Sequence, residues 1–397
     1  MTTYPIARIM GVLNKNPVRQ SVEIKHLTVF IALAPEGAGH LRIWLTGGAV
    51  GTVKCLISQK LPKGAVKMTK PEIHISDVNT FRNCRVKWLF SSRNKMNLTR
   101  KNPYSPFFLG SAMHYAIAAF YTGGRRGAHR AINAYFSRQT ETLGSYDLTA
   151  KQWEDVNEDI ELAKAMIDNY ARWAEENDDF ELIPEIPIVA DRGDYVFRGT
   201  GDGLLQRDGK YYLFEAKTCA RLPQSGKPLL YDNQHISYMW GIAQDPNYAE
   251  YDIQGVLFTF LRKKPPTVPQ TIKSGALSRR HITTTFETYL QAIRDHGLDP
   301  EDYREFLTRL KNQESPFFAR YMMPNNSRRI EVFEKDFEAT VQEMLNEPEI
   351  YPSPSRWYCP RCPFNDLCLM YLNGREIWPV LEANYREQLS GELAVIP

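Results

Sequence analysis

The sequence has 397 residues and a mass of 45.8 kDa, with 43% hydrophobic and 24% charged residues. A chain of this length and composition buries a sizeable core without staples, which excludes a small disulfide scaffold, a disordered chain and a fibrous protein. Its longest apolar run, Leu27 to Ala34, is far shorter than the roughly 20 residues needed to span a bilayer, so no membrane partner is expected.

The net charge of +3 is unevenly distributed along the chain. Residues 1–70 contain ten of the 49 Lys/Arg but two of the 46 Asp/Glu, which leaves 39 basic and 44 acidic residues in 71–397. The net charge therefore does not indicate nucleic-acid binding by the main body, since phosphate binding depends on local basic patches. Residues 1–70 are assigned to an N-terminal extension, either a start placed too far upstream of Met68 or a loosely folded arm. Residues 71–397 are assigned to the main domain.

The first half of the main domain is predicted to be helical. Ser76 can cap a helix that runs through Ser92. A second helix is expected over residues 107–121, closed by the glycines at 123 and 124. Thr149 and Gln152 form a capping box that begins a long amphipathic helix.

The centre of the chain changes to strands. They are predicted at 185–190, 195–206, 211–219 and 253–262, with a helix at 233–244. Helices return at 285–296, 301–312 and 334–346. This order predicts an α/β protein with a strand-rich centre wrapped by helices. The sequence has no GxxxxGK[ST] motif, which excludes a P-loop motor.

A hairpin in this centre carries the most informative residues. Asp208 and Gly209 separate two alternating apolar runs, which predicts a two-residue turn. With these residues as the loop, the two residue numbers of every pair across the hairpin add up to 417. Asp202 is therefore expected directly opposite Glu215. The strand period of two places Lys217 on the same face as Glu215.

Two opposed carboxylates destabilise a sheet, so a folded protein needs a reason to hold Asp202 and Glu215 together. A divalent cation is the natural reason. The alternative is an ordinary ion-pair cluster with Lys217 on a solvated face. Leu213 and Phe214 make the strand apolar on both faces, and stray charges are costly in such a covered strand, which favours the cation.

This arrangement resembles the catalytic core of the PD-(D/E)xK nucleases, with Asp202 as the first acid and Glu215-Ala216-Lys217 as the ExK element. Gly201 stands where a proline usually precedes the acid. D…ExK alone is a weak motif. The resemblance implies a restriction-endonuclease-like fold, namely a mixed sheet flanked by helices.

Two further elements are similar to the RecB-like branch of this family. His114 lies in an upstream helix, in the stretch Gly110 to His114. A lone histidine in a helix is more often structural than a ligand, but the D…ExK core at the expected distance favours a metal role. Gln234 and Tyr238 form a QxxxY pair on the helix after the ExK strand, one turn apart on one face. Simple packing is the alternative explanation for this pair.

Three cysteines near the C-terminus, Cys359, Cys362 and Cys368, have the spacing C-x2-C-x5-C. Such clustering indicates a metal site rather than a disulfide framework. Cys84 is the best candidate for a fourth ligand, because the other two cysteines lie in the N-terminal extension and beside the ExK strand. Four cysteines alone favour structural zinc.

One distant cysteine followed by a C-terminal cluster is similar to the iron-sulfur nucleases, namely the AddB nuclease domain and the CRISPR-associated RecB-like exonucleases. The similarity covers about residues 74–372. It implies a helical subdomain closed by a [4Fe-4S] cluster, with zinc as the alternative. The implied cluster ligands are Cys84, Cys359, Cys362 and Cys368.

The implied activity is a metal-dependent DNA exonuclease that acts on single-stranded DNA or DNA ends. The expected ligands of Mg²⁺ or Mn²⁺ are Asp202, Glu215, the carbonyl of Ala216 and His114. The expected catalytic residues are Asp202, Glu215, Lys217, Gln234 and Tyr238. Lys217 would orient the attacking water and stabilise the oxyanion, and the last two would position the nucleotide.

The alternative function is a non-catalytic adaptor that binds DNA ends and has a structural four-cysteine zinc or iron-sulfur site. Besides DNA, the expected partners are proteins of recombination, repair or CRISPR spacer acquisition. The expected location is the cytoplasm, or the host cytoplasm if the protein is encoded by a virus.

Overall fold

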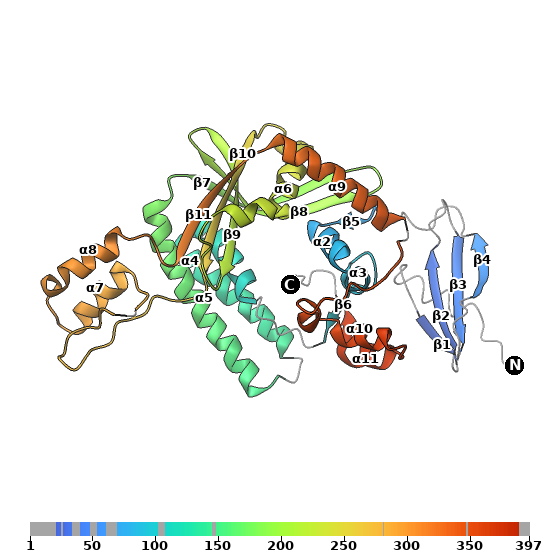
Figure 1. Cartoon of the computed structure of the whole chain (residues 1–397), viewed down its shortest axis with the longest axis horizontal. Coiled ribbons are helices and arrows are strands. Elements are labelled where there is room, and N and C mark those ends of the chain that lie inside the picture. The colour runs from blue at the N-terminus through green and yellow to red at the C-terminus, as the bar shows by residue number, and fades with distance from the viewer. Residues whose placement is uncertain are drawn as a thin grey trace. The chain divides into compact units, whose positions relative to one another are not determined.

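The computed structural model describes residues 70–388 except 102–107, 145–147, 281 and 347, together with the backbone of four strands nearer the N-terminus (Figure 1). The chain divides into two compact units, Met1–Lys70 and Pro71–Pro397. The first unit contains an antiparallel sheet of β1 (Ser21–Ile24), β2 (Leu27–Leu33), β3 (His40–Gly47) and β4 (Lys54–Lys60), paired in chain order. Among the described residues, no helix has the length and apolarity to cross a membrane.

The second unit is built on a six-stranded mixed sheet in the order β11-β10-β9-β8-β5, with β7 also paired to β8. Its strands are β5 (Glu72–Ile73), β7 (Glu181–Asp191), β8 (Val196–Arg207), β9 (Lys210–Cys219), β10 (Ile253–Arg262) and β11 (Phe318–Pro324). The pair β9–β10 is parallel, whereas β8–β9 and β10–β11 are antiparallel. Strand β10 is buried along nearly its whole length, as a central strand covered on both faces must be.

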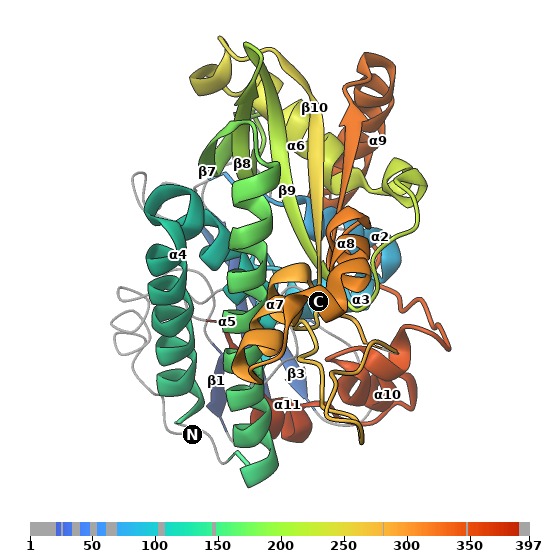
Figure 2. The same ribbon diagram turned by 90° about the vertical axis from the view of Figure 1, so that its left-hand side faces the viewer.

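Helices cover both faces of this sheet. On one face lie α4 (Phe108–Leu143) and α5 (Ala150–Asn177), which pack on Phe214, Leu257 and Leu261 (Figure 2). On the other lie α2 (Ile75–Asn83), α6 (Asn233–Gln244) and α9 (Ser327–Leu345), which pack on Leu213, Phe258 and Phe260. The prediction of a mixed sheet flanked by helices is confirmed. The alternation along β9 and β10 assigns each side chain to one of the two cores.

Several helix predictions differ from the structure. The helix expected at 334–346 is α9, which already begins at Ser327. The helix expected from Ser76 to Ser92 is two helices, α2 and α3 (Arg85–Ser91), because Cys84 between them has an extended backbone with φ −164°. The break turns Val86 and Phe90 of α3 toward a separate apolar cluster. The glycines at 123 and 124 do not close α4. Gly124 adopts a φ of 61° and kinks the helix, which continues to Leu143.

The C-terminal segment returns to the start of the unit. It contains α10 (Asn365–Leu372), α11 (Trp378–Asn384) and β12 (Tyr385–Glu387), which pairs antiparallel with β6 (Leu98–Arg100). Sequence reasoning missed these elements and β11. The two ends of the unit share one apolar cluster, formed by Val86, Phe90, Leu98, Phe364, Leu367 and Tyr385. Short 3₁₀ helices complete the unit at Lys227–Tyr231, Pro246–Tyr248, Pro300–Tyr303 and Cys359–Arg361.

Candidate active site

The β8–β9 hairpin has the turn and register that the sequence predicts. Asp208 and Gly209 have φ values of 51° and 71°, and two positive values are what a type I′ turn requires. Gly203 pairs with Phe214 along the hairpin, and all of the observed pairs sum to 417. Asp202 therefore lies at the end of the paired segment, on the strand beside the ExK residues.

Backbone pairing between β8 and β9 stops at Gly203. Beyond it, the side chain of Asp202 rather than the backbone of β8 bonds to β9. Oδ2 of Asp202 accepts a hydrogen bond of 2.7 Å from the backbone N–H of Ala216. Strand β7 is also irregular here, because its register with β8 skips Glu185, whose φ of 53° is left-handed. Irregular backbone of this kind is common at functional sites. The charged side chains lie where the two central strands separate.

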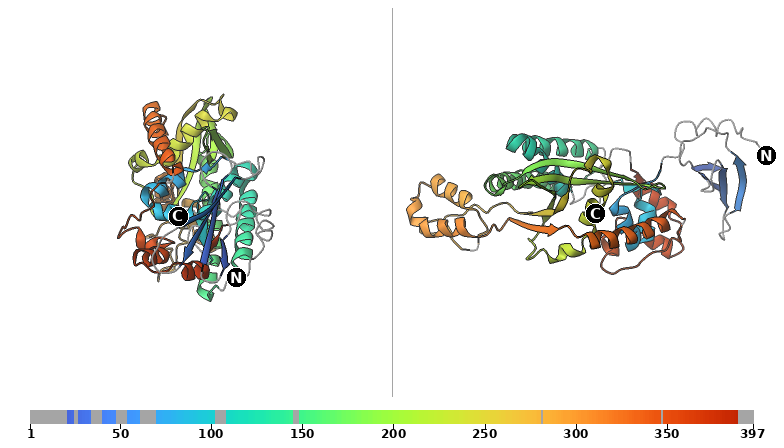
Figure 3. Two further views of the ribbon diagram at one scale, coloured as in Figure 1. Left: turned by 90° about the vertical axis from the view of Figure 1, so that its right-hand side faces the viewer. Right: turned by 90° about the horizontal axis from the view of Figure 1, so that it is seen from above.

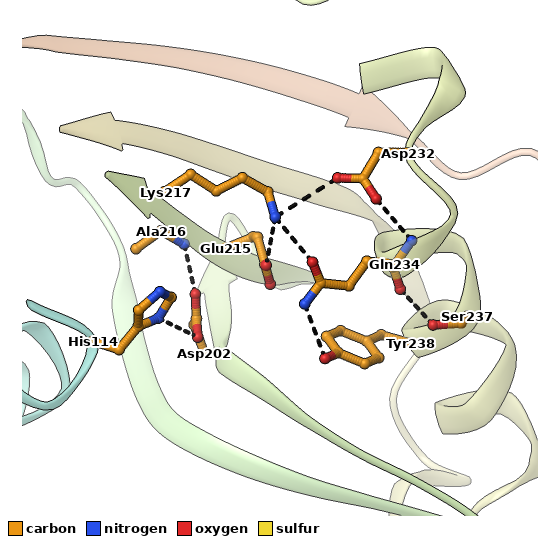
Figure 4. A network of polar contacts seen from close by, with 9 residues as sticks. All are labelled: His114, Asp202, Glu215, Ala216, Lys217, Asp232, Gln234, Ser237 and Tyr238. Atoms are coloured by element: carbon orange, nitrogen blue, oxygen red, sulfur yellow. Dashed lines mark hydrogen bonds and ion pairs between the residues drawn. The ribbon is translucent and has the colours of Figure 1, made fainter. Parts of the chain in front are cut away.

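Glu215 and Lys217 occupy the face of β9 that α6 covers, and only 5% of Glu215 is exposed. The ammonium of Lys217 donates hydrogen bonds to Glu215 Oε1 at 3.1 Å and to Gln234 Oε1 at 3.0 Å (Figure 4). Burial, and then the charge of Asp202, raises the pKa of Glu215 to about 7. Burial disfavours the charged form of Lys217, but the charges of Glu215 and Asp232 outweigh it and raise the pKa of Lys217.

His114 reaches the same site from helix α4. Its Nδ1 lies 2.8 Å from Asp202 Oδ1, and 40% of its side chain is exposed. The charge of Asp202 raises the pKa of His114 to about 9, against the opposing effect of burial. In the absence of another cation, the imidazole is therefore protonated at neutral pH and acts as the counter-ion of Asp202.

Gln234 and Tyr238 are joined to the ExK residues by hydrogen bonds. Nε2 of Gln234 donates to Tyr238 Oη at 3.1 Å, while its Oε1 accepts from Lys217 (Figure 4). The ring of Tyr238 lies against Gly199 of β8, where a Cβ atom would be only 2.8 Å from Cε1. Glycine is required at 199 by this close approach. The pair thus forms a polar connection as well as packing.

Sequence reasoning missed Asp232. Its Oδ1 accepts a hydrogen bond of 2.8 Å from the Gln234 N–H and caps helix α6, and its Oδ2 lies 3.7 Å from the Lys217 ammonium. An aspartate directly before a predicted helix is a recognisable cap, and that signal could have found it. Asp232 fixes the N-terminus of α6 against the ExK strand.

The comparisons with known proteins decide the family. Residues 73–369 match the family model described as the PD-(D/E)XK nuclease superfamily. The chain belongs to the PD-(D/E)XK nuclease superfamily. Curated proteins gave no match. One matching solved structure is titled "Crystal structure of SSO0001"; it is 11% identical, with a TM-score of 0.29, and the match covers 77% of this chain and 88% of that chain. At that score the likeness carries no argument, so the assignment rests on the family match.

PD-(D/E)XK nucleases are phosphodiester-hydrolysing enzymes that typically use Mg²⁺ or Mn²⁺. In the parts of the chain that the structure describes, no three His, Cys, Asp or Glu side chains converge closely enough to hold a metal ion. The donor set of the site nevertheless fits such a cation. Two carboxylates, Asp202 and Glu215, lie together in a covered site. Burial, and then the charge of Asp202, raises the pKa of Glu215, so a bound cation would stabilise its ionised form.

The four cysteines of the expected cluster are gathered at one end of the nuclease unit. Cys84, Cys362 and Cys368 pack against the apolar cluster shared by the two chain ends, and all four are free thiols. Burial and then the charges of Cys84 and Cys359 raise the pKa of Cys368, which requires these thiols to be close neighbours. The backbone N–H of Ser355 donates to Cys359 Sγ at 3.2 Å, and that of Phe364 donates to Cys362. The thiols do not converge on one point within the described chain.

Proposed function

We propose that this nuclease is a metal-dependent exonuclease that degrades DNA from an end, with a preference for single strands. The observation that carries the proposal is a pair of polar networks that meet on the ExK strand. One joins His114 to Asp202 and the Ala216 N–H, and the other joins Glu215 through Lys217 and Gln234 to Tyr238. Resemblance to RecB-like nucleases supports the preference for ends.

Asp202, Glu215, the Ala216 carbonyl and His114 would hold Mg²⁺ or Mn²⁺ in this proposal. A divalent cation supplies positive charge that acidifies the attacking water and neutralises the scissile phosphate. His114 must give up a proton to become a ligand, because the pKa of its imidazole is raised to about 9 beside Asp202. A nitrogen ligand makes Mn²⁺ more acceptable than it is in an all-oxygen site.

The proposed role of Lys217 is electrostatic. Its raised pKa keeps the ammonium charged at neutral pH, so Lys217 donates hydrogen bonds and cannot accept a proton as a general base. A charged donor beside Glu215 orients water and stabilises the extra negative charge of the pentacovalent phosphorane. Gln234 and Asp232 hold this ammonium in place from the N-terminus of α6.

The proposed role of Tyr238 is to position the nucleotide. Burial raises the pKa of Tyr238, so it remains a phenol. Its oxygen accepts the hydrogen bond from Gln234, which leaves its own hydrogen for the substrate. Gly199 lets the ring lie directly against the backbone of β8.

A degradation assay with Mn²⁺ tests the proposal. We expect Asp202→Asn, Glu215→Gln and Lys217→Met each to lower the rate by about 10³-fold or more, since each removes charge that acts in the transition state. Asp208→Asn is the matched control, because this carboxylate lies on the same hairpin with a side chain that is 92% exposed. Equal rates for Asp208→Asn and any two of the three variants would place the active site elsewhere.

The form of the DNA distinguishes the reaction classes. An exonuclease degrades linear single strands and leaves circular single strands intact, whereas an endonuclease opens the circles. Binding of linear ends without hydrolysis in either metal would instead indicate the DNA-end adaptor. The resemblance to AddB and the CRISPR-associated exonucleases supports a proposed role in recombination, repair or spacer acquisition.

We further propose that Cys84, Cys359, Cys362 and Cys368 hold a [4Fe-4S] cluster that closes the nuclease unit. Four gathered thiols and two backbone N–H groups that donate to sulfur support it, since such hydrogen bonds accompany ligating thiolates. Protein purified without oxygen should be brown, with broad absorbance near about 400 nm and about four irons per chain. Stoichiometric zinc without iron would contradict the cluster.

A further inference from the structure

A self-contained insertion leaves the central sheet between β10 and β11. The two strands stay paired as far as Leu261 and Phe318, and the Arg262 N–H donates to the Phe317 carbonyl at 2.9 Å. Residues 263–316 therefore depart and return at one point of the sheet (Figure 3). They include α7 (Phe286–Asp295) and α8 (Arg304–Asn312), which enclose a small core of their own.

The first part of this insertion concentrates positive charge. Residues 262–280, here termed the basic strap, contain six basic residues and no acidic one. The six are Arg262, Lys263, Lys264, Lys273, Arg279 and Arg280. Within the described chain, none of them forms an ion pair with a carboxylate. The following residues 282–316 carry four basic and seven acidic residues, so the charge belongs to the strap rather than to the insertion as a whole.

The strap begins beside the active site. Phe260 of β10 pairs with Lys217, and Arg262 pairs with Cys219, in the parallel register of β10 and β9. Because side chains alternate along a strand, Arg262 lies on the same face of the sheet as Lys217. Two residues of strand separate these positions, or about 7 Å along the sheet.

Arg262 has hydrogen-bonding capacity that the described chain does not use. Its Nε is buried without a partner among the described residues, and its Nη1 donates only a long bond of 3.5 Å to the Pro316 carbonyl. Arg262 as a whole is half-buried, and a donor left unpaired costs free energy unless a ligand supplies an acceptor. Guanidinium geometry fits the oxygens of a phosphate as it fits those of a carboxylate, and a nucleic-acid substrate supplies the phosphate.

We propose that the basic strap binds the phosphodiester backbone of the nucleic-acid substrate as it leaves the active site. The inference rests on the proposed nuclease function and adds the path of the strand. Arg262 contacts a phosphate about one to two nucleotides from the scissile bond, given the spacing of phosphates along a strand. Lys263, Lys273 and Arg280 contact phosphates farther along. These contacts are with phosphates and therefore independent of base sequence.

The test compares two triple variants of the full chain that remove equal charge. The strap variant is Lys263→Gln/Lys273→Gln/Arg280→Gln. The control variant changes three exposed basic residues in helices α7 and α8 of the same insertion. Its substitutions are Arg294→Gln, Arg304→Gln and Lys311→Gln. Both are made in a Glu215→Gln background, so that DNA is bound without being cut, and matched melting temperatures show that the insertion still folds.

Binding of a single strand of about 30 nucleotides is titrated over a range of salt concentrations without divalent metal. We expect the strap variant to bind about tenfold more weakly near physiological salt. The slope of its plot of log affinity against log salt concentration should be smaller in magnitude by about two. Each lost phosphate contact to a single strand lowers that slope by about 0.7, and the variant loses three. The control variant should keep the parent slope. Duplex DNA, tested in parallel, shows whether the strap accepts both forms.

An unchanged slope in the strap variant, or an equal change in the control variant, would overturn the proposal. A parent protein that binds no nucleic acid would overturn it as well. The nuclease function is tested separately, by Mn²⁺-dependent degradation with the unsubstituted chain. A parent that binds DNA through the strap but does not cleave would refute the proposed function alone.

Discussion

In the β8–β9 hairpin, a two-residue turn brings Asp202 beside the ExK strand within a short stretch of chain, whereas Cys84 and Cys359 are separated by 274 residues. The polar atoms of the hairpin are already connected by hydrogen bonds, from Asp202 to Ala216 and from Lys217 to Glu215. The thiols are neighbours that do not converge. The polar network at the hairpin is thus connected by the chain itself, whereas the cysteine group draws on segments far apart in the chain. In neither place do three potential ligands within the described residues converge closely enough to hold a metal ion.

Cys84→Ala has the largest expected effect. It tests the proposal that the cysteine group is held together by a metal cluster. Tying Cys84 to Cys359 through one cluster restricts the unfolded chain by roughly 5 to 6 kcal/mol on the chain-entropy model, which is an upper guide taken from disulfides. We expect the variant to lose its iron, melt far below the parent and accumulate as insoluble protein. Activity should fall only in proportion to folded protein.

Cys219→Ala is the matched control for that experiment, because Cys219 is a half-buried free thiol outside the cysteine group. It should cost about 1 kcal/mol and keep the iron. A Cys84→Ala protein that stays soluble, retains its iron and melts within a few degrees of the parent would show that Cys84 is not a ligand.

The pH dependence of the free energy of unfolding tests the electrostatics of the site on the β8–β9 hairpin. The pKa of Glu215 is raised from 4.5 to about 7, so between these values the folded protein holds a proton that the unfolded chain has released. The metal-free protein should therefore lose about 2 to 3 kcal/mol of stability as pH rises from about 4.5 to 7. Glu215→Gln should flatten this part of the profile, as should saturating Mn²⁺, because both remove the advantage of the protonated carboxyl. The measurement is chemical denaturation across that pH range.

His114 should change the stability of the protein in a second, higher pH range of the same experiment. The pKa of His114 is raised from 6.5 to about 9, so the stability contributed by its contact with Asp202 is complete below 6.5 and is lost as pH rises through 9. His114→Gln should remove that later decline and leave the Glu215 window in place. A single decline shared by both variants would mean that the two groups do not titrate separately.

Tyr238→Phe has the smallest expected effect. It removes the oxygen that accepts from Gln234 while the ring stays packed against Gly199. We expect stability to change by about 1 kcal/mol and the rate of degradation to fall by about tenfold or less. Tyr212→Phe is the control, because Tyr212 of β9 packs into the core on the α4 and α5 side of the sheet, away from α6. Equal rates in the two variants would leave Tyr238 with a packing role only.

Local features of the fold could be predicted because short-range chemistry determines them. Three such features are confirmed: the turn at Asp208 and Gly209, the pairing register of the β8–β9 hairpin, and the capping box at Thr149. Each depends on residues within a few positions of one another. Helix α6 and strand β10 also match their predicted bounds. Each of these segments has a clear period and a clear end.

The errors lie where tertiary packing overrides local pattern. Nothing near Cys84 in the sequence shows that the helix must break there, since the reason is the apolar cluster it shares with Phe364 and Leu367 far along the chain. Gly124 is compatible with either an end or a kink, and the apolar face that continues through Ile132 decides for the kink. The proximity of Asp232 to Lys217 likewise arises only when α6 is placed against β9.

The pairing of β6 with β12 determines when the nuclease unit can be finished during synthesis. Leu98 leaves the ribosome long before its partner Glu387, and at about 5 to 20 residues per second the delay is roughly 15 to 60 seconds. The hairpin ends at Cys219, well before Glu387 is made, so it can fold while Val86, Phe90 and Leu98 still lack their apolar partners. A nascent chain of this protein therefore exposes apolar side chains at one end of the nuclease unit until its last segment arrives, and slower translation lengthens the time in which that end is open to aggregation or chaperone binding.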